Sequence, residues 1–326
     1  MGGHLVSHLL STGRYRVHFL PCETDYMKGR WRKEFKDLIT YDPASLEIDE
    51  SIDFCSVMNA RRQHFARVTS TWFYHELNSI PKKVVEDINS NDSIYVCSSF
   101  VADVFEDQGV TVPMSILGHG FDPKLYAPAR RKHGNEFVFL CVAEHTPRKN
   151  LPMLIESFQK AFQGIRDVKL ILKLGLHGEG DIRRYITLPE QVVLHERRSL
   201  GEVSLARLYQ RAHCFVLPTR AEGFGMPVLE AMATGLPVIV TRYSGHLDFC
   251  TDANSFLITN RGLVENSVDC FPHYKSEWGD PDPDHLISLM RFVHGNYDQA
   301  LERGQQACRD AHSQWTWRKQ LSRSFP

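Results

Sequence analysis

One segment, residues 219–237, constrains the fold of this chain more than any other stretch. It follows a short apolar run and reads TRAEGFGMPVLEAMATGLP in one-letter code. Pro227 suits the first turn of a helix, where its missing N–H costs no hydrogen bond, and Gly235 supplies a helix stop. Residues 222–225 are therefore expected to form a loop between the carboxyl end of a strand and a helix N-terminus, where ligands bind in open α/β sheets.

The same alternation of strand and helix runs through the whole second half of the chain. We expect strands at 137–143, 168–174, 192–195, 214–218 and 237–241, and helices at 151–162 and 202–212. Asn150 is placed to cap the first of these helices. From about residue 282 the pattern predicts two or three amphipathic helices that end near 315–317. Such alternation is typical of a doubly wound α/β domain with a parallel sheet.

The length of 326 residues exceeds the usual size of a single hydrophobic core, so two domains are expected. In the first half, strands are predicted at 15–20, 51–58 and 94–97. Residues 126–135 combine Pro128, three cations and a glycine without apolar periodicity, which is typical of a linker. We therefore predict an N-terminal domain over residues 1–128 and a C-terminal domain over 135–326.

Composition excludes several classes of function. The chain has 38 basic and 39 acidic side chains, and this balance argues against a nucleic-acid binder. No run approaches the ~18–20 apolar residues that span a bilayer, and no signal-peptide pattern is present. The eight cysteines form no C-x-x-C pair, so they are interpreted as small buried hydrophobes in a reducing compartment and not as zinc ligands. We predict a cytoplasmic protein.

The loop and helix of residues 222–230 have the chemistry of an anion site. Backbone amides at a helix N-terminus and the helix dipole favour a diphosphate, and glycines let it approach closely. The residues that would supply these contacts are Gly223, Phe224, Gly225 and Met226. Glu222 can accept hydrogen bonds from sugar hydroxyls, and Glu230 from a ribose. The alternative is a plain turn with two solvated glutamates; the agreement of carboxylates, glycines and flanking strands argues against it.

Glu222 and Glu230, with seven residues between them in this context, resemble the signature of glycosyltransferase family 4. The resemblance implies a GT-B fold, in which two Rossmann-like doubly wound domains face a cleft. It also implies a UDP- or GDP-sugar donor held mainly by the C-terminal domain, and transfer of a hexosyl group with retention at the anomeric carbon. The acceptor would be a hydroxyl of a glycan, glycolipid or cell-envelope polysaccharide, and no metal or other cofactor is implied.

A second segment, T-P-R-K-N at residues 146–150, is similar to the P-R-K-G loop of that family, whose lysine binds the donor diphosphate. Lys149 would take this role with help from Arg148, because a cation stabilises a departing diphosphate. A solvated surface turn is the alternative for a lone Arg-Lys pair, and the position after a strand favours function. The resemblance is compatible with the leaving phosphate acting as the base, so no protein nucleophile is assigned.

Shorter segments add further candidates for the cleft. His119 lies in L-G-H-G-F-D, which resembles the H-G-V-D element of the family near its domain crossover. His75 and Glu76 lie in a segment similar to a tryptophan-glutamate segment of some members, where one of them would face the donor sugar or acceptor. A satisfied, partly buried polar group is the alternative for both. Glu196 ends a strand where the nucleobase contacts of the family lie.

Two departures from the family pattern stand out. Ala143 and Glu144 replace the usual Gly-Arg pair, and a carboxylate there would repel a diphosphate unless Glu144 turns away or pairs with Arg148. Gly2 and Gly3 resemble the glycine turn that follows the first strand, near the acceptor, yet that strand is absent. We therefore expect an N-terminal domain lacking its first strand, either because the chain is a fragment or has a misplaced start, or because the domain is reduced.

Two rival functions and a membrane contact remain open. A GT-B sugar-nucleotide epimerase would need acid/base carboxylates in the cleft, which the sequence does not identify. A non-catalytic GT-B subunit that binds a nucleotide-sugar or a partner enzyme is favoured by Glu144 and the missing strand. The cations and aromatics of residues 28–36 could touch the inner face of a membrane or a lipid-linked acceptor, although a solvated helix face is the simpler interpretation.

Overall fold

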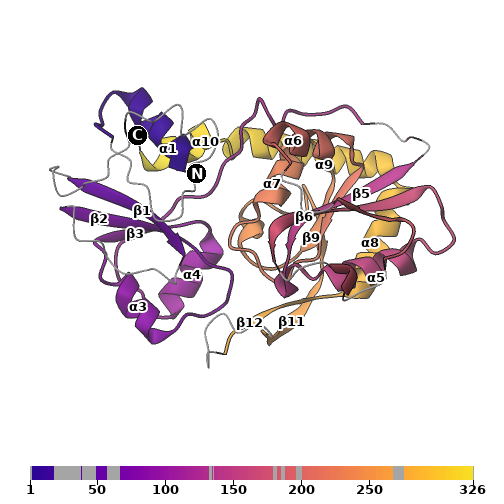
Figure 1. Ribbon diagram of the computed structural model, residues 1–326, viewed down its shortest axis with the longest axis horizontal. Coiled ribbons are helices and arrows are strands. Elements are labelled where there is room, and N and C mark those ends of the chain that lie inside the picture. Colours follow the sequence, from indigo (N-terminus) through magenta and orange to yellow (C-terminus); the bar gives the residue numbers. More distant parts are fainter. Residues whose placement is uncertain are drawn as a thin grey trace.

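The computed structural model describes residues 2–17, 38, 49–56, 67–131, 134, 136–178, 182–184, 188–195, 200–266 and 275–325. Two α/β units lie next to each other, each built on a parallel sheet (Figure 1). The N-terminal sheet has the strand order β1-β2-β3-β4, and the C-terminal sheet has the order β10-β9-β8-β5-β6-β7. This architecture confirms two Rossmann-like domains, whereas the predicted boundary at residues 128–135 stays a prediction.

The N-terminal sheet is all parallel, and a helix connects its second strand to its third and its third strand to its fourth. Its elements are α1 (Gly2–Thr12), β1 (Glu50–Ser56), β2 (Val68–Tyr74), α3 (Lys82–Ile88), β3 (Ser93–Val96), α4 (Ser99–Asp107) and β4 (Met114–Ile116). The predictions at 51–58 and 94–97 are confirmed over β1 and β3, with 57–58 outside the described residues. The strand at 15–20 is wrong over 15–17, which form neither helix nor strand, and 18–20 lie outside the described residues.

Strand β2 was not predicted, although its five central residues are buried. Its first half carries hydroxyl groups, which hid the apolar signal of a buried strand. In the structure these groups bond across to β3 and the turn before it: Ser70 Oγ lies 2.8 Å from Ser93 Oγ, and Thr71 Oγ1 donates to Asn91 Oδ1 at 2.7 Å. Burial is tolerated because the polar groups are paired.

The C-terminal sheet contains every strand predicted from the second half of the sequence. Its elements are β5 (Phe137–His145), η4 (Pro147–Lys149), α5 (Leu151–Ala161), β6 (Val168–Gly178), η5 (Ile182–Arg184), β7 (Val192–His195), α6 (Glu202–Arg211), β8 (Cys214–Leu217), α7 (Met226–Ala233), β9 (Val238–Thr241), η6 (Gly245–Asp248) and β10 (Phe256–Ile258). All residues of β8 and β9 are buried, as expected of central parallel strands covered on both faces. Only β10 was missed within the described part of this sheet.

Asn150 precedes α5 but does not cap it as predicted. Its backbone is left-handed, with φ of 54°, and its side-chain amide contacts the Met153 sulfur at 2.9 Å. The left-handed residue turns the chain from η4 into α5, and asparagine tolerates that conformation better than most residues. The cap prediction was therefore wrong in its hydrogen bond, although the helix begins where it was expected.

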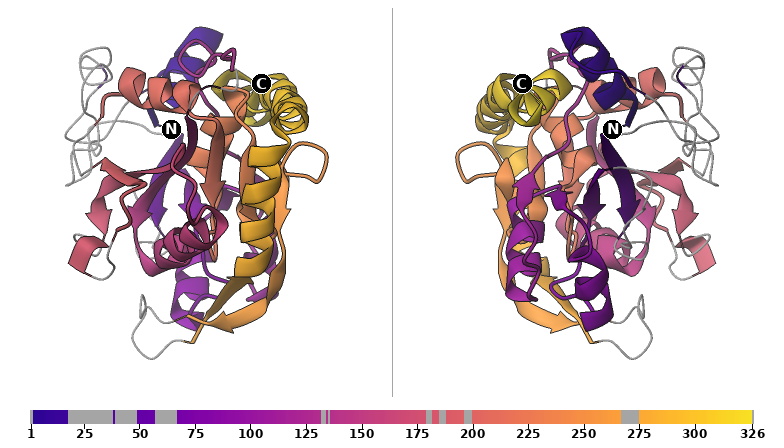
Figure 2. Two further views of the ribbon diagram at one scale, coloured as in Figure 1. Left: turned by 90° about the vertical axis from the view of Figure 1, so that its right-hand side faces the viewer. Right: turned by 90° about the vertical axis from the view of Figure 1, so that its left-hand side faces the viewer.

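The C-terminal tail forms three helices: α8 (Pro283–Gly295), α9 (Tyr297–Gln314) and α10 (Trp317–Ser324). Three helices agree with the predicted two or three, but the last one ends at Ser324 and not near 315–317. Helix α10 reaches back to α1 beside the N-terminal unit, and α1, α9 and α10 lie at the top of both end views (Figure 2). His8 Nε2 lies 2.8 Å from the Phe325 carbonyl oxygen, so the end of the tail is anchored to α1. The chain thus connects the two domains twice.

A two-stranded antiparallel hairpin, β11 (Asn260–Glu265) and β12 (Glu277–Pro281), lies at the bottom of Figure 1 between the two units. Its backbone is joined to the loop after β8, because the Gly279 N–H donates to the Arg220 carbonyl at 2.8 Å. It also meets the N-terminal domain, where the Glu277 N–H donates to Asn78 Oδ1 at 2.8 Å. Besides the connections made by the chain itself, the hairpin therefore adds a contact between the two domains.

Candidate functional site

The glycine-rich loop after β8 lies where the carboxyl edges of the two sheets meet. Ser98, at the end of β3, donates its hydroxyl to the Gly223 carbonyl at 2.5 Å. A Cβ placed on Gly223 would lie 2.6 Å from the His75 carbonyl oxygen, and one on Gly245 would lie 2.0 Å from the Gly223 carbonyl. Glycine is therefore required at both positions by close approach of backbone from the opposite domain and the next loop.

The loop leads directly into α7, as predicted. Gly225 precedes the helix with φ of 94°, a left-handed conformation that favours glycine, and Pro227 lies in the first turn. Gly235 follows the helix with φ of 74°, as its predicted stop requires. Because the first amides of a helix have no partner within it, the segment Phe224–Met226 presents backbone donors at the start of α7.

Four charged side chains gather beside this loop. Lys149 Nζ lies 2.5 Å from Glu222 Oε1, and both residues are buried, with 6% and 4% of their surface exposed. Arg148 Nη1 lies 3.3 Å from Glu222 Oε2, and Arg148 Nη2 lies 3.1 Å from Glu76 Oε1. The structure thus brings together four predicted residues: Glu222, Lys149 and Arg148 of the C-terminal domain and Glu76 of the N-terminal domain.

The environment of Glu222 keeps it ionised. Burial alone would raise its pKa, but the charges of Lys149 and Arg148 and the Lys149 hydrogen bond outweigh burial and lower the pKa to about 2. A carboxylate anion that accepts hydrogen bonds is therefore fixed at the edge of the glycine loop at any physiological pH. Such a group suits the recognition of sugar hydroxyls.

Glu230, about one turn into α7, has the opposite environment. Burial raises its pKa to about 7, although hydrogen bonds from Tyr209 and Tyr126 act in the other direction. The Tyr209 hydroxyl donates to Glu230 Oε2 at 2.9 Å. Glu230 is therefore poised between a neutral and a charged form near neutral pH, with two phenols holding its carboxyl group in place.

Glu144 turns toward the neighbouring strand β6. Its carboxylate lies against Gly175, where an added Cβ would come within 1.9 Å of Oε1. Within the described part of the chain, Glu144 Oε2 is buried without a hydrogen-bond partner. We expected Glu144 either to turn away from the diphosphate or to pair with Arg148. Its orientation toward β6 fits the first expectation. The ion pairs of Arg148 go to Glu76 and Glu222 instead.

The predicted cleft residues occupy different surroundings. His75 is buried with Nε2 3.0 Å from the Ser79 carbonyl oxygen, and burial lowers its pKa. His119 packs edge-on against Trp72, Phe224 and Trp317, and burial lowers its pKa to about 3, so this ring is neutral. His75 is thus a satisfied histidine near the loop, and His119 is an aromatic neighbour of the loop.

Gly2 and Gly3 open helix α1, so they form the start of a helix and not a separate turn. The next residue, His4, stacks on Trp317, whose ring also contacts His119. The start of α1 therefore lies one aromatic layer away from the loop. Glu196 lies outside the described residues.

Sequence reasoning missed the polar residues that follow β3 and β9. The Glu222 N–H donates to Ser244 Oγ at 2.8 Å, and the Gly245 N–H donates to the Glu222 carbonyl at 2.9 Å. Asp248 accepts hydrogen bonds from the N–H and the hydroxyl of Ser99, at the start of α4. The position of these polar residues just beyond the ends of β3 and β9 could have identified them as site residues, because the carboxyl ends of parallel strands share one edge of the sheet.

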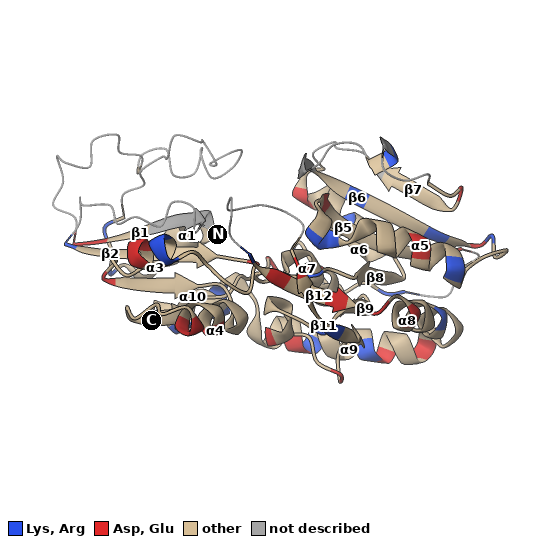
Figure 3. Cartoon of the chain, turned by 90° about the horizontal axis from the view of Figure 1, so that it is seen from below, with Lys and Arg blue, Asp and Glu red and all other residues tan. Residues whose placement is uncertain are grey.

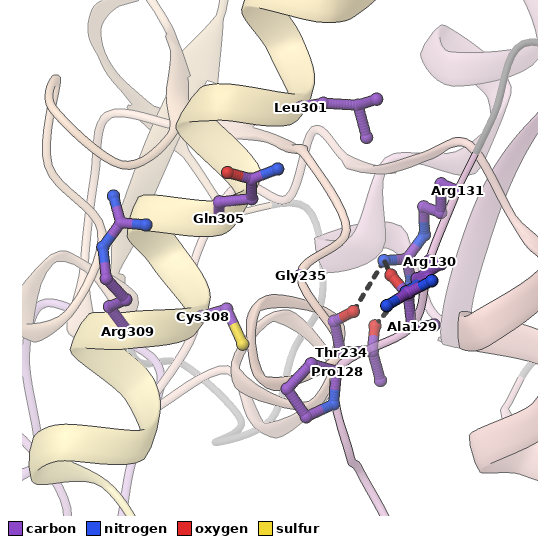
Figure 4. Close-up of a pocket in the computed structure, with 10 residues that line it drawn as sticks. All are labelled: Pro128, Ala129, Arg130, Arg131, Thr234, Gly235, Leu301, Gln305, Cys308 and Arg309. Atoms are coloured by element: carbon purple, nitrogen blue, oxygen red, sulfur yellow. Dashed lines mark hydrogen bonds between the residues drawn. The ribbon is translucent and has the colours of Figure 1, made fainter.

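A second hollow, between the 128–131 segment and helix α9, is lined by three arginines, but its chemistry is structural (Figure 4). The five N–H donors of the Arg131 guanidinium are directed at the Ala212, Ala129, Thr234 and Tyr209 carbonyls and the Thr234 hydroxyl. Arg131 therefore binds the carboxyl ends of α6 and α7, where a cation is favourable, and has no donor left for a ligand.

Basic and acidic residues both occur in each of the two domains. Basic and acidic residues are intermixed over the described part of the view in Figure 3, without an extended field of one sign. Among the described helices, none combines the length and apolar character that crossing a membrane requires. Among the described residues, no cluster of three or more histidine, cysteine or acidic side chains is arranged to hold a metal ion.

Two parallel α/β sheets that meet at a glycine loop with a buried lysine–glutamate pair are consistent with the GT-B architecture. Comparison with known proteins names the family: residues 136–270 match the description "Glycosyl transferases group 1". The C-terminal domain is therefore similar to the group 1 glycosyltransferases, in agreement with the family that its motifs resemble.

Curated relatives match this chain over different shares of its length. A protein of Mycolicibacterium hassiacum named MMP alpha-(1->4)-mannosyltransferase is 28% identical over 149 residues, which are 45% of this chain and 36% of that protein. The Mycobacterium tuberculosis GDP-mannose-dependent alpha-(1-6)-phosphatidylinositol dimannoside mannosyltransferase is 22% identical over 295 residues, 80% of this chain and 74% of that protein. The aligned part of the chain thus spans about a third of the first relative's length.

Solved structures share the fold over nearly the whole chain. A glycosyltransferase from Rickettsia africae superposes with a TM-score of 0.70 at 14% identity, covering 99% of this chain and 92% of that one. Anabaena HepE, in complex with UDP and glucose, gives a TM-score of 0.67 at 15% identity, covering 99% and 95%. These similarities support the fold, and the GT-B prediction is confirmed.

Proposed function

We propose that this protein is a retaining hexosyltransferase that moves a sugar from a UDP- or GDP-sugar to an acceptor hydroxyl. The single observation that carries the proposal is the buried Lys149–Glu222 pair at the glycine loop that opens α7. In this pair a carboxylate suited to sugar hydroxyls and a cation suited to a diphosphate lie side by side, where the two sheets meet. The mannosyl- and galactosyltransferase names among the relatives support the same class.

The roles of the residues follow from their chemistry. The amides of the segment Phe224–Met226 bind the β-phosphate, and Lys149 leaves part of its contact with Glu222 to stabilise the departing diphosphate. Glu222 accepts hydrogen bonds from the sugar, and Glu230 accepts from the ribose. In the reaction, the bond from the anomeric carbon to the phosphate oxygen breaks as the bond to the acceptor oxygen forms. The acceptor proton passes to the leaving phosphate, so no protein nucleophile is required.

Independence from metal ions is part of this proposal, because Lys149 and the loop amides supply the positive charge that a leaving diphosphate needs. The acceptor is a glycan or glycolipid hydroxyl, in keeping with relatives named for phosphatidylinositol dimannoside and capsular polysaccharide. We place the reaction in the cytoplasm, at the inner face of the membrane when the acceptor is lipid-linked.

The proposal is tested by turnover of a panel of UDP- and GDP-hexoses by the purified protein in the presence of EDTA. Release of UDP or GDP by the wild type, lost in Glu222→Ala and in Lys149→Ala, is the expected result. Lys169→Ala is a matched control, because this exposed lysine pairs with Glu136 at the surface, far from the loop. Turnover that persists in both site variants would contradict the proposal.

A second function, a non-catalytic subunit that binds a nucleotide-sugar, is favoured by one observation. Glu144, which stands where the family has a diphosphate-binding arginine, is buried against Gly175 and contributes no positive charge. The same panel separates the two functions. Tight binding of a donor without release of its nucleotide would support the subunit.

A further inference from the structure

Arg148 joins the two domains through one guanidinium. Its Nη1 donates to the Ala221 carbonyl at 2.7 Å and lies 3.3 Å from Glu222 Oε2, both in the loop after β8. Its Nη2 donates to Glu76 Oε1 at 3.1 Å, in the segment after β2 of the other domain. The side chains of Arg148 and Glu76 are 20% and 33% exposed, so solvent screens their attraction only in part.

The charges around the loop balance only when the domains are together. Glu222 and Glu76 face Lys149 and Arg148, which gives two negative and two positive groups. Withdrawal of Glu76 leaves the loop with one excess positive charge and leaves Arg148 with Glu222 alone. Because an arginine shared between two carboxylates is held in one orientation, Glu76 determines how Arg148 presents itself to Glu222.

The contacts nearby support a closed arrangement at this point. Ser98 donates to the Gly223 carbonyl, and Ser99 donates to Asp248, so the starts of α4 and η6 are also joined. Both contacts cross from the N-terminal to the C-terminal domain beside the same loop. The Glu76–Arg148 pair is the charged member of this set, and it alone reaches the carboxylate that is expected to hold the sugar.

We propose that Glu76 is a positioning residue: through Arg148 it orients Glu222 for the donor sugar and stabilises the closed arrangement of the two domains. Arg148 then acts chiefly as a bridge between two carboxylates, and Lys149 acts as the diphosphate cation. The proposal rests on the proposed transferase function for its kinetic consequences. Its structural consequence, that an ion pair between the domains holds them closed, does not depend on the transferase function.

The proposal predicts that Glu76→Gln affects nucleotide binding and sugar transfer differently. UDP and GDP lack the sugar that Glu222 contacts, so Glu76→Gln leaves their affinity within about twofold of the wild type. Transfer requires Glu222 in its bridged orientation, so the kcat for transfer falls by about tenfold or more, which is about 1.4 kcal/mol. Water reaches a loosely closed cleft, so donor hydrolysis rises relative to transfer. A merely structural role would lower binding and transfer together.

The test uses Glu76→Gln, Arg148→Gln and the double variant, with Glu86→Gln as the matched control. Glu86 is an exposed glutamate of the same domain, whose pair with Lys83 stays within α3. Calorimetry with UDP and GDP measures binding, and product analysis gives the ratio of hydrolysis to transfer. The double variant is expected to lose no more than the worse single variant, because both break one pair. Additive losses, or UDP and GDP affinities that fall as in Lys149→Ala, would overturn the proposal.

Small-angle X-ray scattering without ligand keeps the inference independent of turnover. The radius of gyration is expected to increase in Glu76→Gln and to stay at the wild-type value in Glu86→Gln. If the wild type turns over no donor, the proposed transferase function is wrong. The scattering measurement still tests whether the Glu76–Arg148 ion pair holds the domains closed. An unchanged radius in Glu76→Gln, with circular dichroism showing that the variant is folded, would overturn the positioning role.

Discussion

The two glutamates of the α7 segment lie eight residues apart and occupy opposite electrostatic environments. Glu222 is held between Lys149 and Arg148, and its pKa is lowered to about 2. Glu230 is buried beside Tyr209 and Tyr126, and its pKa is raised to about 7. The same side chain thus becomes a permanent anion at one end of the segment and a titratable group at the other.

The difference shows that the groups in contact with a buried carboxyl group determine its pKa more than burial itself does. Cations stabilise the charged form, whereas phenols donate hydrogen bonds without cancelling the charge. A permanent anion suits a sugar, whose many hydroxyls are donors. A carboxyl group that titrates near pH 7 would make the proposed ribose contact depend on pH. The predictions below test this contrast, beginning with the largest effect.

Removal of the lysine should have the largest effect. In Lys149→Ala the buried Glu222 loses its closest cation, and breaking one side of a buried pair costs about 3–5 kcal/mol of unfolding free energy. Urea denaturation measures the loss. Lys169→Ala, which breaks a half-exposed pair, should change stability by less than about 1 kcal/mol. Equal effects of the two variants would contradict the contrast between buried and exposed charge.

The pH dependence of stability should separate the two glutamates. The folded pKa of Glu222 lies below its usual value of 4.5, so its contribution is present above pH 4.5 and is lost as pH falls toward 2. The folded pKa of Glu230 lies above 4.5, so stability falls as pH rises from 4.5 to 7. Glu230→Gln should remove that second slope, worth about 2–3 kcal/mol. A slope that survives in Glu230→Gln would assign it to another group.

The close approach at Gly223 predicts a selective loss of function. An added Cβ would meet the His75 carbonyl at 2.6 Å, so Gly223→Ala forces the two domains apart at the loop. We expect turnover to fall by about tenfold to a hundredfold, because a displacement of about 1 Å can cost a factor of a hundred. Gly295→Ala, at the last residue of α8 with open space around it, is the control for glycine replacement in general. Normal turnover in Gly223→Ala would show that the domains need not meet there.

The smallest effect is expected at Glu144. Its buried Oε2 has no hydrogen-bond partner among the described residues, and glutamine removes the charge while keeping the shape. Glu144→Gln should raise the affinity for UDP or GDP by about twofold to threefold, since a nearby negative charge opposes the diphosphate. Calorimetry at low ionic strength gives the largest signal. A fall in affinity would show that Glu144 supports the site.

The C-terminal domain was predictable because its local signals agree with its tertiary surroundings. Strands such as β8 and β9 are short apolar runs, and the turn from β8 into α7 is marked by Gly225 and Pro227, whose backbone preferences match the observed conformation. The site residues Glu222 and Lys149 were recognisable because each follows a strand at the same edge of one sheet. The C-terminal half could be predicted because its local sequence preferences are consistent with its tertiary structure.

The N-terminal domain and the contacts between domains were less predictable. The hydroxyl groups of Thr69, Ser70 and Thr71 obscure the apolar pattern of β2, because they find partners only once β1, β3 and the turn before β3 lie beside them. The contact of Ser98 with Gly223 joins residues far apart in the chain, and no local pattern encodes it. Glu76 was a candidate for the sugar or acceptor, but its bond to Arg148 depends on the folded meeting of two domains.

The most direct test of the contrast between Glu222 and Glu230 is calorimetry of donor binding from pH 5.5 to 8.5, with the nucleotide-sugar that the panel identifies. We predict that wild-type affinity rises with pH through about pH 7, where Glu230 ionises. Glu230→Gln should bind more weakly and without this dependence, whereas Glu222→Gln should keep the dependence and lose turnover. A pH dependence that disappears in Glu222→Gln and persists in Glu230→Gln would contradict the account.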